Sequence, residues 1–395
     1  MPLADVDVVV PVLPTECARC RQPWFGGDPQ PSRHQVTALP PPKPVVTEYQ
    51  LHRLACTPCG AVTRADVPAG VSPRAFGPRV QATVALCTGA YHLSKRTTQQ
   101  VMEDLFGLSI GLGTITHLEH ATTQALAAPV AEAQGYVQAQ PVAHLDETGW
   151  REGRARTWLW VAVTAWVTVF VIRLSRGGKV VQELLGERFY GILVTDRWSA
   201  YNWYPTRWRQ VGWAHLLRDI EAMIERGGRS QAIGEALREQ ARQMFPWWHD
   251  VRDGTLPHAR FRVLMRPIRR EVARLLKAGQ TCGVPKTEGV CREVLKVYDA
   301  LWTFVRVEGV DPTNNAAERA IRPGVLWRKG SFGTQSANGS RFVEAMMTVV
   351  ATLKQQHRNV LAYMTEVCQA AYTGTSAPSL LPCGTETQEE LPAVA

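Results

Sequence analysis

The order of the apolar segments between residues 141 and 213 constrains the fold of this sequence more than any other feature. Runs rich in β-branched and aromatic residues predict strands, and a run with helical spacing after two glycines predicts a helix. In chain order these are strands at 142–147, 157–164 and 167–173, a helix at 175–185, and strands at 191–196 and 208–213. Strands interrupted by a helix predict a sheet with helices packed on it, in an α+β or α/β fold.

Three acidic residues stand at prominent positions around this predicted sheet. Asp146 lies on the first strand, and Asp196 ends the apolar fourth strand. Glu318 falls in the first turns of a helix predicted to begin at residue 315. A carboxylate at the end of an apolar strand is costly unless it is paired or binds a metal. The strand order is that of a ribonuclease-H-like core, whose first and fourth strands are neighbours. Asp146 and Asp196 can therefore converge, and a helix packed across the sheet can bring in Glu318.

Three converging carboxylates suit a two-metal reaction at a phosphodiester. Mg²⁺, or Mn²⁺ in its place, prefers the oxygen ligands that Asp and Glu supply. One ion activates the attacking oxygen, and the other stabilises the leaving oxygen of an in-line displacement. The alternative is that these are ordinary solvated acids, since a chain of this length contains many. The placement of Asp146 and Asp196 on strands strengthens the case for a metal site, and both interpretations stay open at this point.

Paired cysteines near the start of the sequence predict a second, structural metal site. Cys17 and Cys20 form one C-x-x-C pair, and Cys56 and Cys59 form another. Two such pairs can place four thiolates tetrahedrally around one Zn²⁺, and a region poor in core-forming residues needs such a staple. We therefore predict a zinc-binding module at 15–73, with a hairpin strand at 45–54; four unrelated thiols are the alternative. The other cysteines, at 87, 282, 291, 368 and 383, show no ligand spacing.

Helical patterns surround the predicted sheet. Residues 74–135 contain three short helical segments with a glycine-containing turn, which fits either a helix-turn-helix that contacts DNA or a packing module. The catalytic domain is predicted at 136–371, with a large helical insertion at about 214–308. Within this region, helices are predicted at 223–226, 230–245, 260–277, 288–307 and 340–371. The tail at 372–395 is rich in Pro, Thr and Glu, and we predict that it is disordered.

The net charge of +9 is unevenly distributed. Residues 196–330 contain 24 basic and 15 acidic residues, whereas the rest of the chain contains 20 of each. A basic region of this kind fits a polyanion such as nucleic acid, or else a solubilising surface. The longest uncharged apolar run, 157–172, is shorter than the ~20 residues of a membrane-spanning helix. These features predict a cytoplasmic protein without a membrane partner.

Three motifs carry a resemblance to a known family. They are Leu145 to Trp150 (LDETGW), Thr195 to Tyr201 (TDRWSAY) and Asp311 to Pro323 (DPTNNAAERAIRP). They resemble the three catalytic blocks of the bacterial transposases of the insertion sequence 66 family, and the double-cysteine segment resembles that family's zinc module. The likeness covers roughly residues 15 to 370. The sequence departs from the family in its short segment before Cys17, which suggests a truncated start, and in Arg197-Trp198 after the second Asp.

The resemblance implies a DDE transposase on a ribonuclease-H-like fold, with Asp146, Asp196 and Glu318 as the catalytic triad. It also implies action on DNA as a homo-oligomer, with possible accessory proteins of the same element. Cations near the third motif are candidates for contacts with DNA phosphates. These candidates are Arg319, Arg322, Arg328 and Lys329, together with His215 and Arg218 at the start of the helical insertion. For Thr313, Asn314 and Asn315 we predict helix capping rather than substrate contact.

The function predicted from these features is that of an insertion-sequence transposase. The enzyme hydrolyses a phosphodiester at the transposon end with Mg²⁺ and joins the freed 3′-hydroxyl to target DNA. One alternative is a catalytically inactive, transposase-derived DNA-binding protein, which the intact carboxylate triad disfavours. Another is a different ribonuclease-H-like nuclease, which the zinc module and the helical insertion disfavour.

Overall fold

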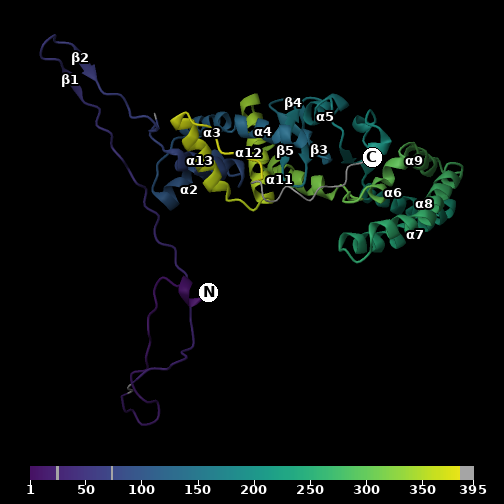
Figure 1. The fold of residues 1–395 in the computed structure, drawn as a ribbon, viewed down its shortest axis with the longest axis horizontal. Coiled ribbons are helices and arrows are strands. Elements are labelled where there is room, and N and C mark those ends of the chain that lie inside the picture. The colour runs from purple at the N-terminus through teal and green to yellow at the C-terminus, as the bar shows by residue number, and fades with distance from the viewer. Residues whose placement is uncertain (24–25, 73, 383–395) are drawn as a thin grey trace. The chain divides into compact units, whose positions relative to one another are not determined.

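The structure is a computed structural model that describes residues 1–23, 26–72 and 74–382 (Figure 1). The chain divides into two compact units, residues 1–43 and residues 44–395. The larger unit is a mixed α/β structure in which helices surround one five-stranded sheet. Among the described residues, no helix is both long and apolar enough to cross a membrane.

Short turns and a small hairpin make up the cysteine-containing region. In the first unit, a 3₁₀ helix spans Leu3–Asp5. In the second unit, β1 (Arg53–Ala55) pairs antiparallel with β2 (Val62–Arg64). The predicted strand at 45–54 is wrong in its bounds, and only its last two residues belong to β1. The reason is that the partner strand β2 is itself only three residues long.

Four helices form the region before the sheet. They are α1 (Pro78–Gly89), α2 (Lys95–Phe106), α3 (Leu112–Ala125) and α4 (Ala127–Gln138). The first three confirm the predicted helical segments and share a small core that includes Val84, Met102 and Ile115. The fourth was not predicted, because the apolar residues of α4 are mostly alanines and its helical period is weak in the sequence.

The sheet contains five strands in the order β5-β4-β3-β6-β7. Strands β3, β4 and β5 pair antiparallel, whereas β6 is parallel to both β3 and β7. The helix α5 (Gly178–Leu185) connects β5 to β6. The strands are β3 (Val142–Glu152), β4 (Ala155–Val163), β5 (Thr168–Arg173), β6 (Ile192–Thr195) and β7 (Arg209–Val211). The five predicted strands and the helix are confirmed, although β3 is longer than predicted because β4 pairs with it as far as Glu152.

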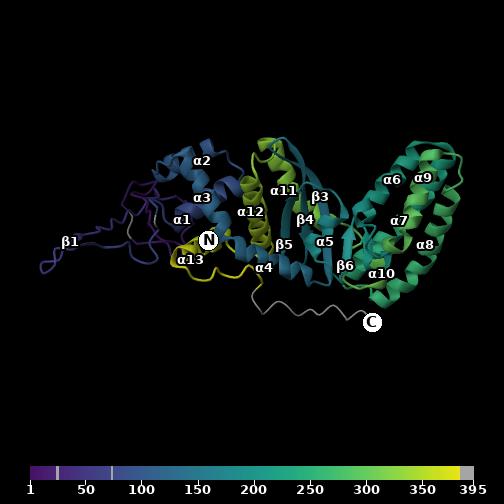
Figure 2. The ribbon, with the colours of Figure 1, turned by 90° about the horizontal axis from the view of Figure 1, so that it is seen from above.

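Each face of the sheet packs into its own hydrophobic core. Successive side chains of a strand point to opposite faces. Trp160 therefore packs with α4, α5 and the C-terminal helices, while its neighbours Leu159 and Val161 pack with α11 (Asn315–Ser331). Helix α12 (Ala337–Gln355) contributes to both cores, since it lies along the β5 side of the sheet (Figure 2).

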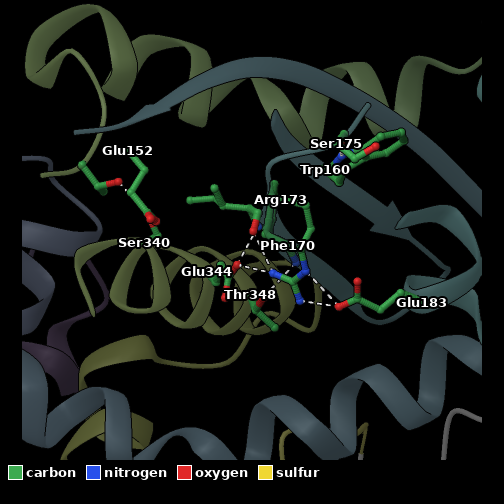
Figure 3. A network of polar contacts seen from close by, with 11 residues as sticks. Glu152, Trp160, Phe170, Arg173, Ser175, Glu183, Ser340, Glu344 and Thr348 are labelled. Atoms are coloured by element: carbon green, nitrogen blue, oxygen red, sulfur yellow. Dashed lines mark hydrogen bonds and ion pairs between the residues drawn. The ribbon is translucent and has the colours of Figure 1, made fainter. Parts of the chain in front are cut away.

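Helix α12 also satisfies the hydrogen bonds of the edge strand β5. The Oε1 atom of Glu344 accepts the N–H of Ile172 at 2.6 Å, and the Oγ1 atom of Thr348 accepts that of Phe170 at 3.0 Å (Figure 3). One turn further on, Thr352 accepts the N–H of Thr168 at 3.1 Å. Four helical residues rise about 6 Å and two strand residues about 6.6 Å, so the two spacings match. The helix thereby covers an edge that would otherwise be open to pairing with another strand.

A helical insertion separates β7 from α11. Its main helices are α6 (Trp213–Glu225), α7 (Gly228–Arg252), α8 (His258–Gly279) and α9 (Pro285–Lys296), followed by a 3₁₀ turn at Tyr298–Leu301 and the short α10 (Thr303–Arg306). Apart from Trp213, the first residue of α6, these helices lie within the predicted insertion at about 214–308, and they share a core that includes Trp213, Met265 and Trp302. The helix predicted at 288–307 is wrong in its second half, where the chain turns at Val297 to bury Leu301 and Trp302.

The C-terminal helix predicted at 340–371 is two helices, α12 and α13 (Val360–Thr373). The break lies at His357, whose φ of 55° ends α12, and Asn359 caps α13 by accepting the N–H of Ala362 at 2.9 Å. The predicted disordered tail also differs in its first part, because Leu380 is buried and its N–H donates to Glu132. Residues 383–395, including Cys383, lie outside the described part of the chain.

Candidate active site

The parallel pairing of β3 and β6 places Asp146 and Asp196 side by side. His144 of β3 is opposite Val194 of β6. Asp146 comes two residues after His144, and Asp196 comes two residues after Val194. Because strand side chains repeat every two residues, both aspartates project from the same face of the sheet. Each has one carboxylate oxygen fixed by a backbone N–H, from Glu147 at 2.9 Å and from Trp198 at 2.8 Å.

Glu318 reaches the same face from the first turn of α11. This helix packs on β3 and β4 through Ala317 and Ile321, which face the sheet. The close approach requires Gly324, since a Cβ there would collide with Leu159 of β4. The Oε1 atom of Glu318 is buried and has no hydrogen-bond partner among the described residues, although the Nε2 atom of His215 lies 3.2 Å away.

The three carboxylates influence one another electrostatically. Burial raises the pKa of Asp146 to about 7, and the negative charges of Glu147, Asp196 and Glu318 contribute in the same direction. The pairing of β3 with β6 and the packing of α11 on β3 thus place the three acids at one face of the sheet. Among the residues that the structure describes, no three His, Cys, Asp or Glu side chains lie close enough to enclose a metal ion. The acids share one electrostatic environment without closing around a common point.

The start of α11 is tied directly to β3 by Asn314. Its Nδ2 atom donates to the carbonyl oxygen of Leu145 at 2.7 Å, one residue before Asp146. The predicted capping role of Asn314 is wrong, because within the described part of the chain its side chain makes no capping hydrogen bond. Its contact with Leu145 joins positions 169 residues apart, which no local pattern reveals. Asn314 therefore orients the helix that carries Glu318.

An ion pair between the buried Glu147 and the partly exposed Arg176, which the sequence did not reveal, lies behind the aspartates. Glu147 accepts hydrogen bonds from Nε of Arg176 at 2.9 Å and from the hydroxyl of Tyr201 at 2.6 Å. Burial raises the pKa of Glu147, and the hydrogen bond from Tyr201 and the charge of Arg176 oppose that shift. The one sequence signal for this ion pair is that Glu147 directly follows Asp146 on a strand, so its side chain points to the opposite face of the sheet.

Two chains of contacts connect this ion pair to Asp196. In the first, Arg176 stacks on the indole of Trp198 at 3.9 Å, and the Nε1 atom of Trp198 donates to the Arg176 carbonyl at 3.2 Å. In the second, the fully buried Arg209 donates to the carbonyl oxygens of Tyr201 and of Asp196, each at 3.1 Å. Glu147 is thus linked to the loop of Asp196 by two routes, one through Arg176 and Trp198 and the other through Tyr201 and Arg209.

The predicted DNA-contacting cations differ in how they are engaged. His215 and Arg218 of α6 face Glu318, with the Nη2 atom of Arg218 3.7 Å from its Oε1 atom. Arg328 donates from Nη1 to Oγ1 of Thr148 at 3.2 Å and to the carbonyl of Gly149, so it fastens α11 to β3. Three further cations of α11 are exposed and make no ion pair among the described residues: Arg319, Arg322 and Lys329.

Both cysteine pairs lie in turns of the same geometry. In the first unit, the N–H of Cys17 donates to the carbonyl of Gln22 at 2.8 Å, and the N–H of Arg21 donates to the carbonyl of Cys17 at 2.9 Å. In the second unit, the equivalent bonds join Cys56 to Ala61 at 2.7 Å and Gly60 to Cys56 at 2.8 Å.

Both turns also place the fourth residue after the first cysteine in the left-handed region, at φ of 61° for Arg21 and 69° for Gly60. Backbone N–H groups that point at the sulfur lower the pKa of Cys17, and a backbone N–H near Ala61 lowers that of Cys59. Each turn therefore favours the thiolate, which is the form that binds a metal.

Comparison with known proteins gives two matches. A family model described as the transposase IS66 family matches residues 74–341, a range that contains all three carboxylates. The uncharacterized protein y4qI of Sinorhizobium fredii (strain NBRC 101917 / NGR234) is 25% identical over 218 residues. That alignment covers 51% of this chain and 39% of the relative, so the chain spans well under half of the relative's length.

Proposed function

The chain belongs to the IS66 family of transposases, and from that premise we propose that it is the DNA transposase of an insertion sequence. In this proposal, it cuts a phosphodiester at the transposon end and joins the freed 3′-hydroxyl to target DNA. The observation that carries the proposal is the placement of three acids that are far apart in the sequence: Asp146 and Asp196 follow paired positions of neighbouring parallel strands, and Glu318 lies on the helix packed against β3 and β4.

A ribonuclease-H-like core is the reading of the fold that accompanies this function. It is supported by the strand order, with three antiparallel strands followed by two parallel ones, and by the neighbouring places of β3 and β6. It is also supported by a helix that crosses one face and carries the third acid. In this reading, the insertion between β7 and α11 is an addition to the core.

The residues at the site fit divalent cations with a preference for oxygen ligands. The donor set consists of carboxylates, and burial together with mutual repulsion makes the ionised state of Asp146 unfavourable without added positive charge. Asp146, Asp196 and Glu318 would hold Mg²⁺ or Mn²⁺. When bound, such ions supply activation of the attacking oxygen and neutralisation of the leaving oxygen.

The protein's own residues supply orientation and contacts with the DNA. The backbone N–H groups of Glu147 and Trp198 each fix one carboxylate oxygen of the two aspartates. His215 and Arg218 hold the carboxylate of Glu318 until substrate arrives. The exposed cations Arg319, Arg322 and Lys329 bind phosphates next to the cut bond, because they lie on the helix that carries Glu318 or at its end.

Zinc belongs to the proposal as a structural ion. The two cysteine turns share hydrogen bonds, backbone conformation and thiolate-favouring N–H groups, although they belong to different units. Four thiolates are a common ligand set for structural Zn²⁺. We propose that both pairs, Cys17 with Cys20 and Cys56 with Cys59, supply thiolate ligands to structural Zn²⁺.

The test of the proposed function is a reaction of wild-type protein with labelled DNA. A duplex carrying the element's terminal repeat is incubated with Mg²⁺ and supercoiled target DNA, with and without accessory proteins of the same element. We expect nicks at the repeat's end and joined products, with no such products from a scrambled repeat. Tight binding without cleavage in any condition would favour the inactive DNA-binding protein, and cleavage without regard to the repeat would favour another nuclease.

A further inference from the structure

The positive charge of this protein is concentrated on one helix of the insertion. Helix α8 (His258–Gly279) contains seven Arg and Lys residues and one acidic residue, Glu271, so its net charge is +6. The whole chain carries +9. Two thirds of the net charge therefore belongs to 22 of the 395 residues. By contrast, the neighbouring α7 pairs three of its arginines with acidic side chains.

The cations of α8 form a regular stripe on its solvent side. The buried positions, which include Phe261, Met265 and Val272, repeat at helical spacing and face the insertion's core. The exposed cations follow one another at spacings of four, four, four and three residues, at Arg262, Arg266, Arg270, Arg274 and Lys277. At 1.5 Å per residue the stripe is about 22 Å long.

Three arginines of the stripe make no ion pair within the described part of the chain: Arg262, Arg266 and Arg270. Arg274 is paired with Glu271, at 2.6 Å. Like charges four residues apart on a helix repel each other and destabilise it. An extended stripe of this kind is therefore unfavourable for the isolated protein, and a polyanion would relieve that repulsion.

We propose that the α8 stripe binds the phosphate backbone of duplex DNA. The choice of DNA as the polyanion rests on the proposed function. A stripe of about 22 Å matches about six base pairs of one strand at 3.4 Å each. Figure 1 and Figure 2 both show α8 on the side of the insertion turned away from the sheet. The duplex bound there is thus a second segment, held apart from the phosphate that the carboxylates cut.

The experiment compares two triple variants of the full chain. The first, R262Q/R266Q/R270Q, removes three stripe charges. The control, R238Q/R242Q/R252Q, removes three charges from α7, where each arginine has an acidic partner. Binding to a random-sequence duplex of about 40 base pairs is titrated between about 50 and 200 mM salt, since each phosphate contact contributes about 0.9 to the salt slope.

We expect the stripe variant to lose two to three units of salt slope, at about 0.9 per lost contact, and at least about tenfold in affinity at 100 mM salt. The control should lose less than one such unit, because its arginines are engaged within the protein. Without DNA, the stripe variant should melt at the same temperature as wild type or higher, since repulsion has been removed. A lower melting temperature would assign the stripe a structural role instead.

Equal losses in both variants would reduce the effect to overall charge and would overturn the proposal, as would no loss in either. The proposal would also be overturned if the binding of poly-glutamate or of double-stranded RNA depended on the stripe more strongly than the binding of DNA does. The outcome is separate from catalysis. Stripe-dependent DNA binding by a protein that cuts no transposon end would refute the transposase function and leave the stripe's role in place.

Discussion

Glu147 shows how a residue next to a candidate ligand can matter without touching substrate. Its side chain is 1% exposed, and it holds Arg176 and Tyr201, which in turn contact the loop of Asp196. A buried carboxylate of this kind is tolerated because its lone pairs are filled by charged and hydroxyl donors. We interpret Glu147 as a positioning residue for Asp196.

Replacing Glu147 by Gln should therefore impair metal use more than folding. The amide keeps a partner for Tyr201 but removes the charge that holds Arg176, which is itself partly exposed, so we expect a loss of about 1–2 kcal/mol in the free energy of unfolding. The Mg²⁺ concentration for half-maximal cleavage should rise several-fold, as measured in a metal titration of the cleavage rate.

The matched control is Glu183→Gln. It breaks the half-exposed pair with Arg173, at 2.6 Å, on the far edge strand (Figure 3). Such pairs contribute about 0–1 kcal/mol. An unchanged Mg²⁺ requirement in Glu147→Gln, or an equal change in the control, would show that Glu147 has no positioning role.

Several residues show why part of the site could be predicted from sequence and part could not. Asp146 and Asp196 were identifiable because Asp146 lies on the first predicted strand and Asp196 ends the apolar fourth one, and a strand's period fixes which face a side chain occupies. The contacts of Asn314 and Arg328 within the protein could not be predicted, because their partners, Leu145 and Gly149, lie 169 and 179 residues away. Local patterns carry no information about contacts at that separation.

At the scale of elements, the position of α11 decides whether Glu318 meets the two aspartates. The helix lies close to β4 because Gly324 faces Leu159 and the Cε atom of Met347, which would be 3.1 Å from an added Cβ. The regular strands and most helices were predictable from apolar periodicity. The break at His357 was not, since no Gly or Pro marks it.

Gly324→Ala should displace α11 from the sheet. We expect a loss of about 1–3 kcal/mol in stability from overpacking, together with strongly reduced cleavage. Gly330→Ala in the same helix is the control, because a Cβ there meets nothing within 4 Å, and alanine favours the helix by about 1 kcal/mol. Thermal melting and cleavage rates are measured for both. A Gly324→Ala protein with wild-type melting and activity would contradict the close packing.

At the scale of the whole molecule, the chain combines a carboxylate site on a mixed sheet, a charged helical insertion and two cysteine turns. The concentration of basic residues in 196–330 was visible in the sequence. That α8 carries +6 of the chain's net charge of +9, with most of its cations on the solvent side, became clear only once the bounds and buried positions of that helix were known. The net positive charge of the chain thus lies mainly on α8.

The zinc assignment makes a prediction about the N-terminal region. Purified wild-type protein should contain about one Zn²⁺ per chain by elemental analysis. Cys17→Ser together with Cys20→Ser should release it and increase proteolysis within residues 15–72, because two of four thiolate ligands are lost. Cys87→Ser, which changes a buried cysteine outside both turns, should keep the zinc. Full zinc content in the double variant would place the ligands elsewhere.

The central claim, that Asp146, Asp196 and Glu318 form a metal-dependent catalytic site, is tested most directly with Asp146→Asn. The measurement is Mg²⁺-dependent cleavage of a labelled transposon-end duplex, alongside a DNA-binding titration, with Asp253→Asn as an exposed control. We predict that Asp146→Asn lowers cleavage about 10³-fold or more, because metal activation supplies several kcal/mol of the barrier reduction. DNA affinity should stay within about twofold, since phosphate contacts determine it. Cleavage by Asp146→Asn at the rate of wild type and of the control would contradict this account.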